Sequence, residues 1–75
     1  MNAVTYYSII KRASQEALSL LTTGYVESWH YYDDEEETFL AKFKHGRNGN
    51  HVMMKLSATR LVMWSDNKVI KDQPL

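Results

Sequence analysis

The apolar residues of this chain change their spacing once, at Gly24. Before Gly24 they recur every three or four residues, which is typical of an amphipathic helix. After it, short segments rich in aromatic and β-branched residues are separated by turn-forming residues, which indicates strands. The sequence therefore predicts one helix followed by a series of strands, with the helix at about 4–23 and strands at about 25–32, 38–44, 51–57, 60–65 and 68–71.

Short connections between the strands favour pairing as antiparallel neighbours. The helix must bury its apolar stripe against one face of the resulting meander. We therefore expect an α+β fold in a single domain, 1–75, with one N-terminal amphipathic helix packed on a four- to five-stranded antiparallel sheet. The predicted core comprises Tyr6, Ile9, Ile10, Ala13, Ala17, Leu20, Leu21, Phe39, Ala41, Phe43, Val52, Met54, Leu56 and part of 61–64.

Several residues fall outside this predicted core. Alternation along the two middle strands places Lys42, Lys44, His51, Met53 and Lys55 on the other face of the sheet. Tyr7 and Leu18 lie beside the polar face of the helix, where two large apolar groups are a first hint of a contact surface.

The length of the chain and its lack of cysteine narrow the possible functions. A chain of 75 residues buries only roughly 60% of its unfolded surface, and without cysteine it has neither a disulfide nor a thiolate nucleophile. No phosphate-binding glycine loop and no Gly-x-Ser-x-Gly motif is present, and the three histidines lack the spacing of a helical zinc motif. We therefore expect a protein that is not an enzyme and that needs no cofactor or metal.

One arrangement of histidines is still worth weighing as a metal site. His45 and His51 flank the same predicted hairpin, and either Asp66 or an acid from 33–37 is a possible third ligand. We favour the simpler interpretation, in which these are solvated loop histidines.

The net charge of zero conceals a strong separation of charge along the chain. Five consecutive acids at 33–37 are followed by 38–60, which contain no acid and five Lys or Arg residues. Blocks of opposite charge steer association and fix its orientation.

The leading hypothesis is a non-enzymatic protein-binding module. Its predicted contact surface combines the acidic segment with aromatic and methionine side chains: Glu27, Trp29, Tyr31, Tyr32, Asp33, Asp34, Glu35, Glu36, Glu37 and Met53. Such an acidic run beside an aromatic strand is one way to imitate a nucleic-acid backbone. The competing interpretation is a solvated acidic turn whose neighbouring aromatics belong to the core.

Two alternative functions stay open. The first is nucleic-acid binding by the basic hairpin of 42–55, through Lys42, Lys44, Arg47, His51 and Lys55. The second is a structural small subunit that forms homo-oligomers, because the charge polarity allows two copies to join acidic end to basic face. A homodimer is also compatible with the leading hypothesis.

Part of the second half of the chain resembles the phage proteins that inhibit uracil-DNA glycosylase. The similar segments are Asn50-His51-Val52-Met53-Met54, Arg60-Leu61-Val62-Met63, Asp66-Asn67-Lys68 and Ile70-Lys71. Val26-Glu27-Ser28, with the acids at 33–37, is similar to the glutamate and serine element of the acidic edge strand through which those inhibitors imitate DNA. The chain differs from them in its zero net charge and in lacking a clear second helix.

This resemblance implies a small phage or mobile-element protein that inhibits a host nucleic-acid-processing or defence protein. The chain has no apolar run of membrane-spanning length and no signal-peptide pattern at its start. We therefore expect a cytoplasmic location, in the host cytoplasm if a phage encodes the protein, and no membrane partner.

Overall fold

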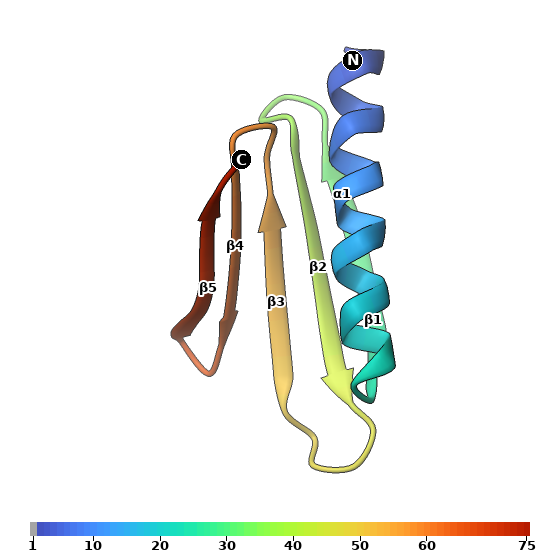
Figure 1. Ribbon diagram of the computed structural model, residues 1–75, viewed down its shortest axis with the longest axis vertical. Helices are drawn as coiled ribbons and strands as arrows, with labels where there is room; N and C mark the ends of the chain where they lie inside the picture. The colour runs from blue at the N-terminus through green and yellow to red at the C-terminus, as the bar shows by residue number, and fades with distance from the viewer. Residues whose placement is uncertain (1) are drawn as a thin grey trace.

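The computed structural model describes residues 2–75 and shows one helix packed on a five-stranded antiparallel sheet (Figure 1). This confirms the predicted α+β fold. The elements are α1 (Ala3–Thr22), β1 (Tyr25–Asp33), β2 (Thr38–His45), β3 (His51–Leu56), β4 (Arg60–Ser65) and β5 (Lys68–Pro74). Each strand pairs with the next in the chain, so the sheet order is β1-β2-β3-β4-β5 and β1 and β5 are its edges.

A capping side chain marks the start of α1, and a glycine marks its end. The Asn2 side chain accepts a hydrogen bond from the Thr5 backbone N–H at 3.1 Å, which caps the first turn. At the other end Gly24 has a φ of +98°, a conformation that glycine adopts at little cost. The chain can therefore reverse and return as β1 directly beneath the helix.

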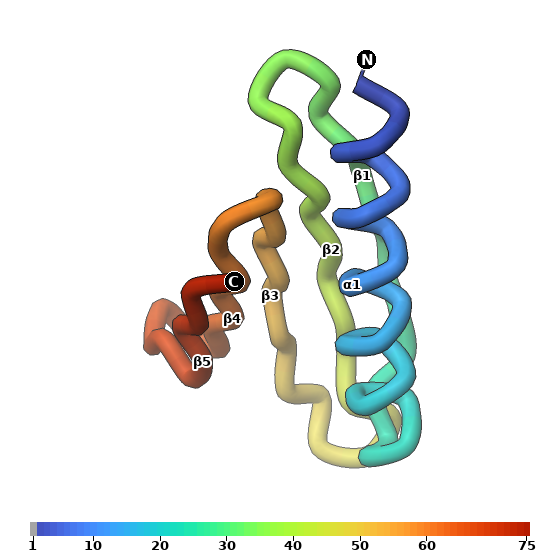
Figure 2. The backbone as a smooth tube through the Cα atoms, turned by 45° about the horizontal axis from the view of Figure 1, so that its top comes forward, coloured from blue at the N-terminus to red at the C-terminus, as the bar shows by residue number. Residues whose placement is uncertain are grey.

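The core lies between α1 and the sheet face that curls around it. Ile9 and Ala13 are the buried residues of α1, and they meet buried side chains from β2, β3 and β4, among them Phe43, Met54 and Leu61. Figure 2 shows how far β4 and β5 turn away from the direction of β1 and β2. This twist brings β5 close enough for polar contacts with the helix.

Those contacts come from two side chains on one flank of α1. Arg12 donates to the Gln73 side chain at 3.1 Å, and Lys71 pairs with Glu16 at 3.2 Å. An ion pair between Arg12 and Glu16 at 3.2 Å links the two contacts. β1 therefore lies along one flank of α1, and side chains of β5 contact the other flank.

Two details differ from the sequence prediction. Leu21, predicted to lie in the core stripe, is 49% exposed because it lies on the flank of α1 where no strand continues beyond β1. The last strand extends to Pro74, beyond its predicted end at 71. An edge strand tolerates proline because the missing N–H removes no bond to a further strand.

We predict that Gly24→Ala destabilises the fold. A methyl group at this position meets His45 Nε2 at 2.7 Å, and the φ of +98° is strained for any residue with a Cβ. We expect a loss of about 1–2 kcal/mol in the free energy of unfolding, measured by urea denaturation. Gly46→Ala is the matched control, because its nearest neighbouring atom lies at 3.7 Å. An equal loss in both variants would contradict this account of the turn.

Candidate binding surfaces

The sheet face turned away from α1, here called the exposed sheet face, has no covering element within residues 2–75. The strand register places Trp29 opposite Lys42, Lys42 opposite Met53, and Met53 opposite Trp64, so these four side chains form one row across four strands. The same face also carries Val26, Tyr31, Leu40, Lys44, His51, Lys55, Arg60, Val62, Val69, Ile70, Asp72 and Pro74.

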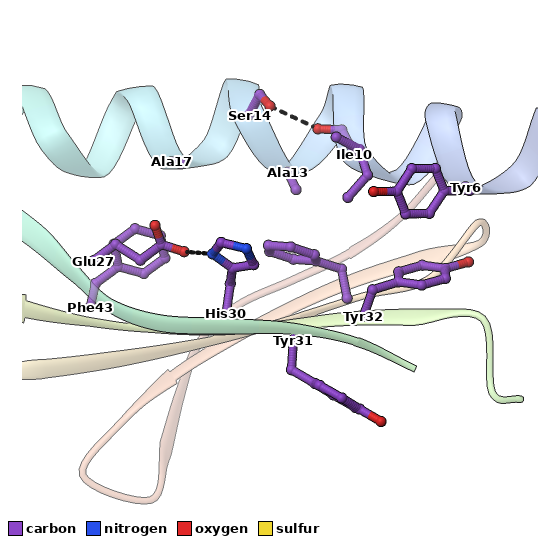
Figure 3. A pocket seen from close by; sticks show the side chains of 11 residues that line it. Tyr6, Ile10, Ala13, Ser14, Ala17, Glu27, His30, Tyr31, Tyr32 and Phe43 are labelled. Carbon is purple, nitrogen blue, oxygen red and sulfur yellow. Dashed lines mark hydrogen bonds and ion pairs between the residues drawn. The ribbon is translucent and has the colours of Figure 1, made fainter. Parts of the chain in front are cut away.

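Large apolar side chains of this face are accessible to solvent. Trp29 is 44% exposed and Tyr31 is 58% exposed, and Val26, Val69 and Ile70 are exposed as well. In Figure 3 Tyr31 points away from the helix, whereas the neighbouring Tyr32 points toward it. The exposed sheet face therefore presents an aromatic and aliphatic surface rather than the polar one typical of a solvated sheet face.

The cations among these apolar groups are free of ion pairs within the described chain. Among residues 2–75, the acids paired with Lys or Arg are Glu16 and Asp72. Asp72 forms two hydrogen bonds of 2.7 Å with Arg60, which lower the pKa of Asp72 and raise that of Arg60. Lys42, Lys44 and Lys55 thus leave the exposed sheet face with a net positive charge.

The structure divides the predicted protein-binding residues among three places. Trp29, Tyr31 and Met53 lie on the exposed sheet face, whereas Glu27 and Tyr32 lie on the helix side of β1. The third group, Asp33, Asp34, Glu35, Glu36 and Glu37, forms the end of β1 and the turn into β2.

The predicted nucleic-acid set stays mostly together. Lys42, Lys44, His51 and Lys55 share the exposed sheet face, and Arg47 lies in the β2–β3 loop. Sequence reasoning missed Trp64 as a site residue. The signal for it was present, since the strand of 60–65 is apolar at four successive positions and so has apolar groups on both faces.

The acidic turn lies at one end of the molecule and the β2–β3 loop at the other (Figure 1). The long axis measures 38 Å, and α1 begins at the acidic end and ends near the β2–β3 loop, which carries Arg47. These charges complement the helix dipole, which is positive at its start and negative at its end.

The acidic turn also affects Tyr32 at the end of β1. Burial, and then the charges of Glu37 and Asp34, raise the pKa of Tyr32. The Tyr32 ring contacts the Tyr6 ring, with 4.8 Å between the ring centroids.

A cleft of about 520 Å³ lies between α1 and β1 (Figure 3). On its floor His30 Nδ1 lies 2.6 Å from Glu27 Oε1, and the His30 ring stacks on Phe39. A histidine held by a carboxylate can activate a nucleophile. The Ser14 hydroxyl that lines the same cleft donates instead to the backbone carbonyl of Ile10 at 2.9 Å.

Of the two histidines that flank the hairpin, His45 has a structural role, whereas Nδ1 of His51 is buried without a hydrogen-bond partner within residues 2–75. His45 Nδ1 accepts from the backbone N–H groups of Arg47 and Asn48, which makes Nε2 the donor to the Thr23 carbonyl at 3.1 Å. His45 thereby ties the β2–β3 loop to the end of α1. Within residues 2–75 no three His, Asp or Glu side chains are grouped to hold a metal ion.

No helix in the described part of the chain is both long enough and apolar enough to cross a membrane. No protein-family model, no curated protein and no solved structure matches the sequence or the fold. The resemblance to the glycosylase inhibitors thus stays a prediction, and a functional proposal has to rest on the surfaces described above.

Proposed function

We propose that this protein is a non-enzymatic module that binds another protein through its exposed sheet face. The observation that carries the proposal is the row Trp29, Lys42, Met53 and Trp64, which crosses four strands on a face without a cover. Aromatic residues and methionine are enriched at the centres of protein interfaces. Buried aromatic anchors also supply much of the binding energy there.

The architecture supports a role for this face in binding. A sheet with apolar side chains on both faces normally carries a second layer on each of them. Residues 2–75 contain a single helix, and it covers the opposite face. A partner that supplies the missing layer would bury Trp29 and Tyr31, which otherwise stay in contact with water.

The charges define the chemistry of such a partner. Lys42, Lys44 and Lys55 lie among the apolar residues and form no ion pair within residues 2–75, so they suit an apolar partner surface that also carries acidic residues. The acidic turn at the end of the molecule then fixes the orientation of the partner. Its acids gather in one turn instead of following β1, so we assign them orientation rather than DNA mimicry. Inhibition of a host nucleic-acid-processing or defence protein is the setting we propose, on the resemblance of 50–71.

Replacing Tyr31 and Met53 together by alanine is expected to weaken partner binding at least tenfold, since loss of interface anchors typically costs about 2 kcal/mol each. The measurement is affinity capture from the cells that produce the protein, followed by a Kd for the purified partner. Gln15→Ala with Ser19→Ala, on the exposed side of α1, is the control pair. Equal capture by both double variants would rule out this face as the binding surface.

Single-stranded nucleic acid is a second candidate ligand. It is favoured by Lys42, which lies between Trp29 and Trp64 in the row, and by Lys44 and Lys55 on the same face, none of which forms an ion pair within residues 2–75. Bases stack on aromatic rings while lysines contact phosphates. Lys42→Ala with Lys44→Ala should then lower the affinity for a labelled oligonucleotide and flatten its dependence on salt, whereas Lys11→Ala with Lys68→Ala should not. Tryptophan fluorescence can follow binding, because both tryptophans lie on this face. Absence of any salt-sensitive binding would eliminate this candidate.

A further inference from the structure

The two edges of the sheet differ in how well they are protected. Native proteins protect an edge strand with lysine, proline or an irregular register. β5 has all three: Lys68, Lys71, Pro74 and a register shift opposite Met63 and Trp64. β1 is nine residues long and contains no lysine, proline or glycine, although its register shifts between Glu27 and Trp29.

The outer backbone groups of β1 are free to accept another strand. Within residues 2–75, its backbone forms no backbone hydrogen bond outside the ladder with β2. α1 contacts both β1 and β2, and Figure 1 shows it in front of β1. The longer of the two edge strands is thus also the less protected one.

A second apolar stripe runs along α1 outside the core. Val4 and Tyr7 near the start of the helix are 82% and 69% exposed, and Leu18 and Leu21 near its end are 62% and 49% exposed. With Lys11 and Ser14 between them, these six positions have the alternating spacing of three and four residues with which one helix packs along another. We call these six positions the outer stripe.

Part of the outer stripe lies on the flank of α1 that is nearer to the free edge of β1, namely Tyr7, Ser14, Leu18 and Leu21. Val4 and Lys11 lie further round the helix, on the side opposite the buried Ile9 and Ala13. Arg12 and Glu16 mark the opposite flank of the helix, because they bind side chains of β5. Ser14 of the stripe lines the cleft along β1, and Tyr7 contacts Tyr6, which in turn contacts Tyr32 of β1. The unpaired strand edge and most of the apolar side chains of the outer stripe therefore lie on the same side of the molecule.

We propose that a second copy of this chain occupies this side, with the two β1 strands paired antiparallel around a two-fold axis. In such a pair the two α1 helices also run antiparallel, which places Val4 opposite Leu21, Tyr7 opposite Leu18, and Lys11 opposite Ser14. Apolar residues then meet apolar residues at both ends, and polar residues meet in the middle. A two-fold interface requires a self-complementary surface of this kind.

The midpoints of the outer stripe and of β1 lie at the same level along the molecule, as a single two-fold axis requires. The centre of the outer stripe lies between Arg12 and Ala13, about 10 Å along the helix from Tyr6 at 1.5 Å per residue. Trp29, at the centre of β1, lies about 10 Å along the strand from Tyr32 at 3.3 Å per residue. Because the rings of Tyr6 and Tyr32 are in contact, both centres lie at the same level. One axis can therefore relate the strands and the helices together.

The spacing and the charges are also compatible with this pairing. Strands are about 4.8 Å apart, so helices that lie above β1 and β2 in each copy are separated by roughly 10 Å, close to the packing distance of helices. The antiparallel arrangement brings the acidic turn of one copy toward the end of the other copy that carries Lys44 and Arg47. The opposite charges at the two ends of the chain thus become complementary between copies.

The proposal does not depend on the proposed function, because the interface uses the edge and the helix stripe. We expect light scattering to show a particle of twice the 8.8 kDa chain mass, and Tyr7→Glu with Leu18→Glu to abolish it. Ser8→Glu with Ser19→Glu, exposed on the same helix outside the stripe, should leave the dimer intact. A monomer at every concentration, or a dimer that survives the stripe variant, would overturn the proposal.

Cross-linking tests the antiparallel arrangement itself, because the chain has no cysteine of its own. A mixture of Val4→Cys and Leu21→Cys chains should be joined by a short bis-maleimide. Each variant alone should not, since like positions lie about 25 Å apart at 1.5 Å per residue. Both side chains are exposed, and circular dichroism can confirm that the variants fold. Cross-linking of either variant to itself, or none in the mixture, would overturn this geometry.

Discussion

The packing of one helix into the curve of one sheet is the interaction on which the rest of this structure depends. Ile9 and Ala13 are the buried residues of α1, so a narrow stripe of the helix closes the core over the buried side chains of β2, β3 and β4. The small Ala13 lets the helix approach the sheet closely. Arg12 donates to Gln73 and Glu16 pairs with Lys71, and these contacts stabilise β5 against the helix. This single layer of contacts accounts for the buried apolar residues of the described chain.

The same constraint explains what remains open. The one helix covers one face of the sheet, so the exposed sheet face, the edge of β1 and the outer stripe of α1 have no cover within residues 2–75. These surfaces are distinct but adjacent. Pairing two copies along β1 would bring the Trp29 and Tyr31 side chains of both copies to the middle of one continuous sheet face. In that arrangement a partner would meet twice the aromatic surface, with lysines on both sides of it.

Much of the fold could be predicted because the spacing of the apolar residues clearly distinguishes the helix from the strands. Alternation along β2 and β3 separated Phe43 and Met54 from Lys42 and Met53, and short turns fixed the order of the strands. The sequence could not show which side chains of β1 face the helix, because aromatic and polar residues occur on both sides of the strand. The shift in register between Glu27 and Trp29 also interrupts the alternation. The structure was needed to show that Glu27 and Tyr32 turn toward the helix. The prediction that Leu21 is buried was wrong for a related reason, because the apolar stripe of a helix does not show where the sheet beneath it ends.

The central claim is that the exposed sheet face, and not the helix side, meets the partner. Tyr31 and Tyr32 are adjacent in sequence and point to opposite sides of β1 (Figure 3). A photo-reactive benzoylphenylalanine at each position in turn therefore tests the claim most directly, in the cells that produce the protein. We predict a cross-link to another protein from position 31 and none from position 32. A cross-link from position 32 with none from position 31 would contradict the account.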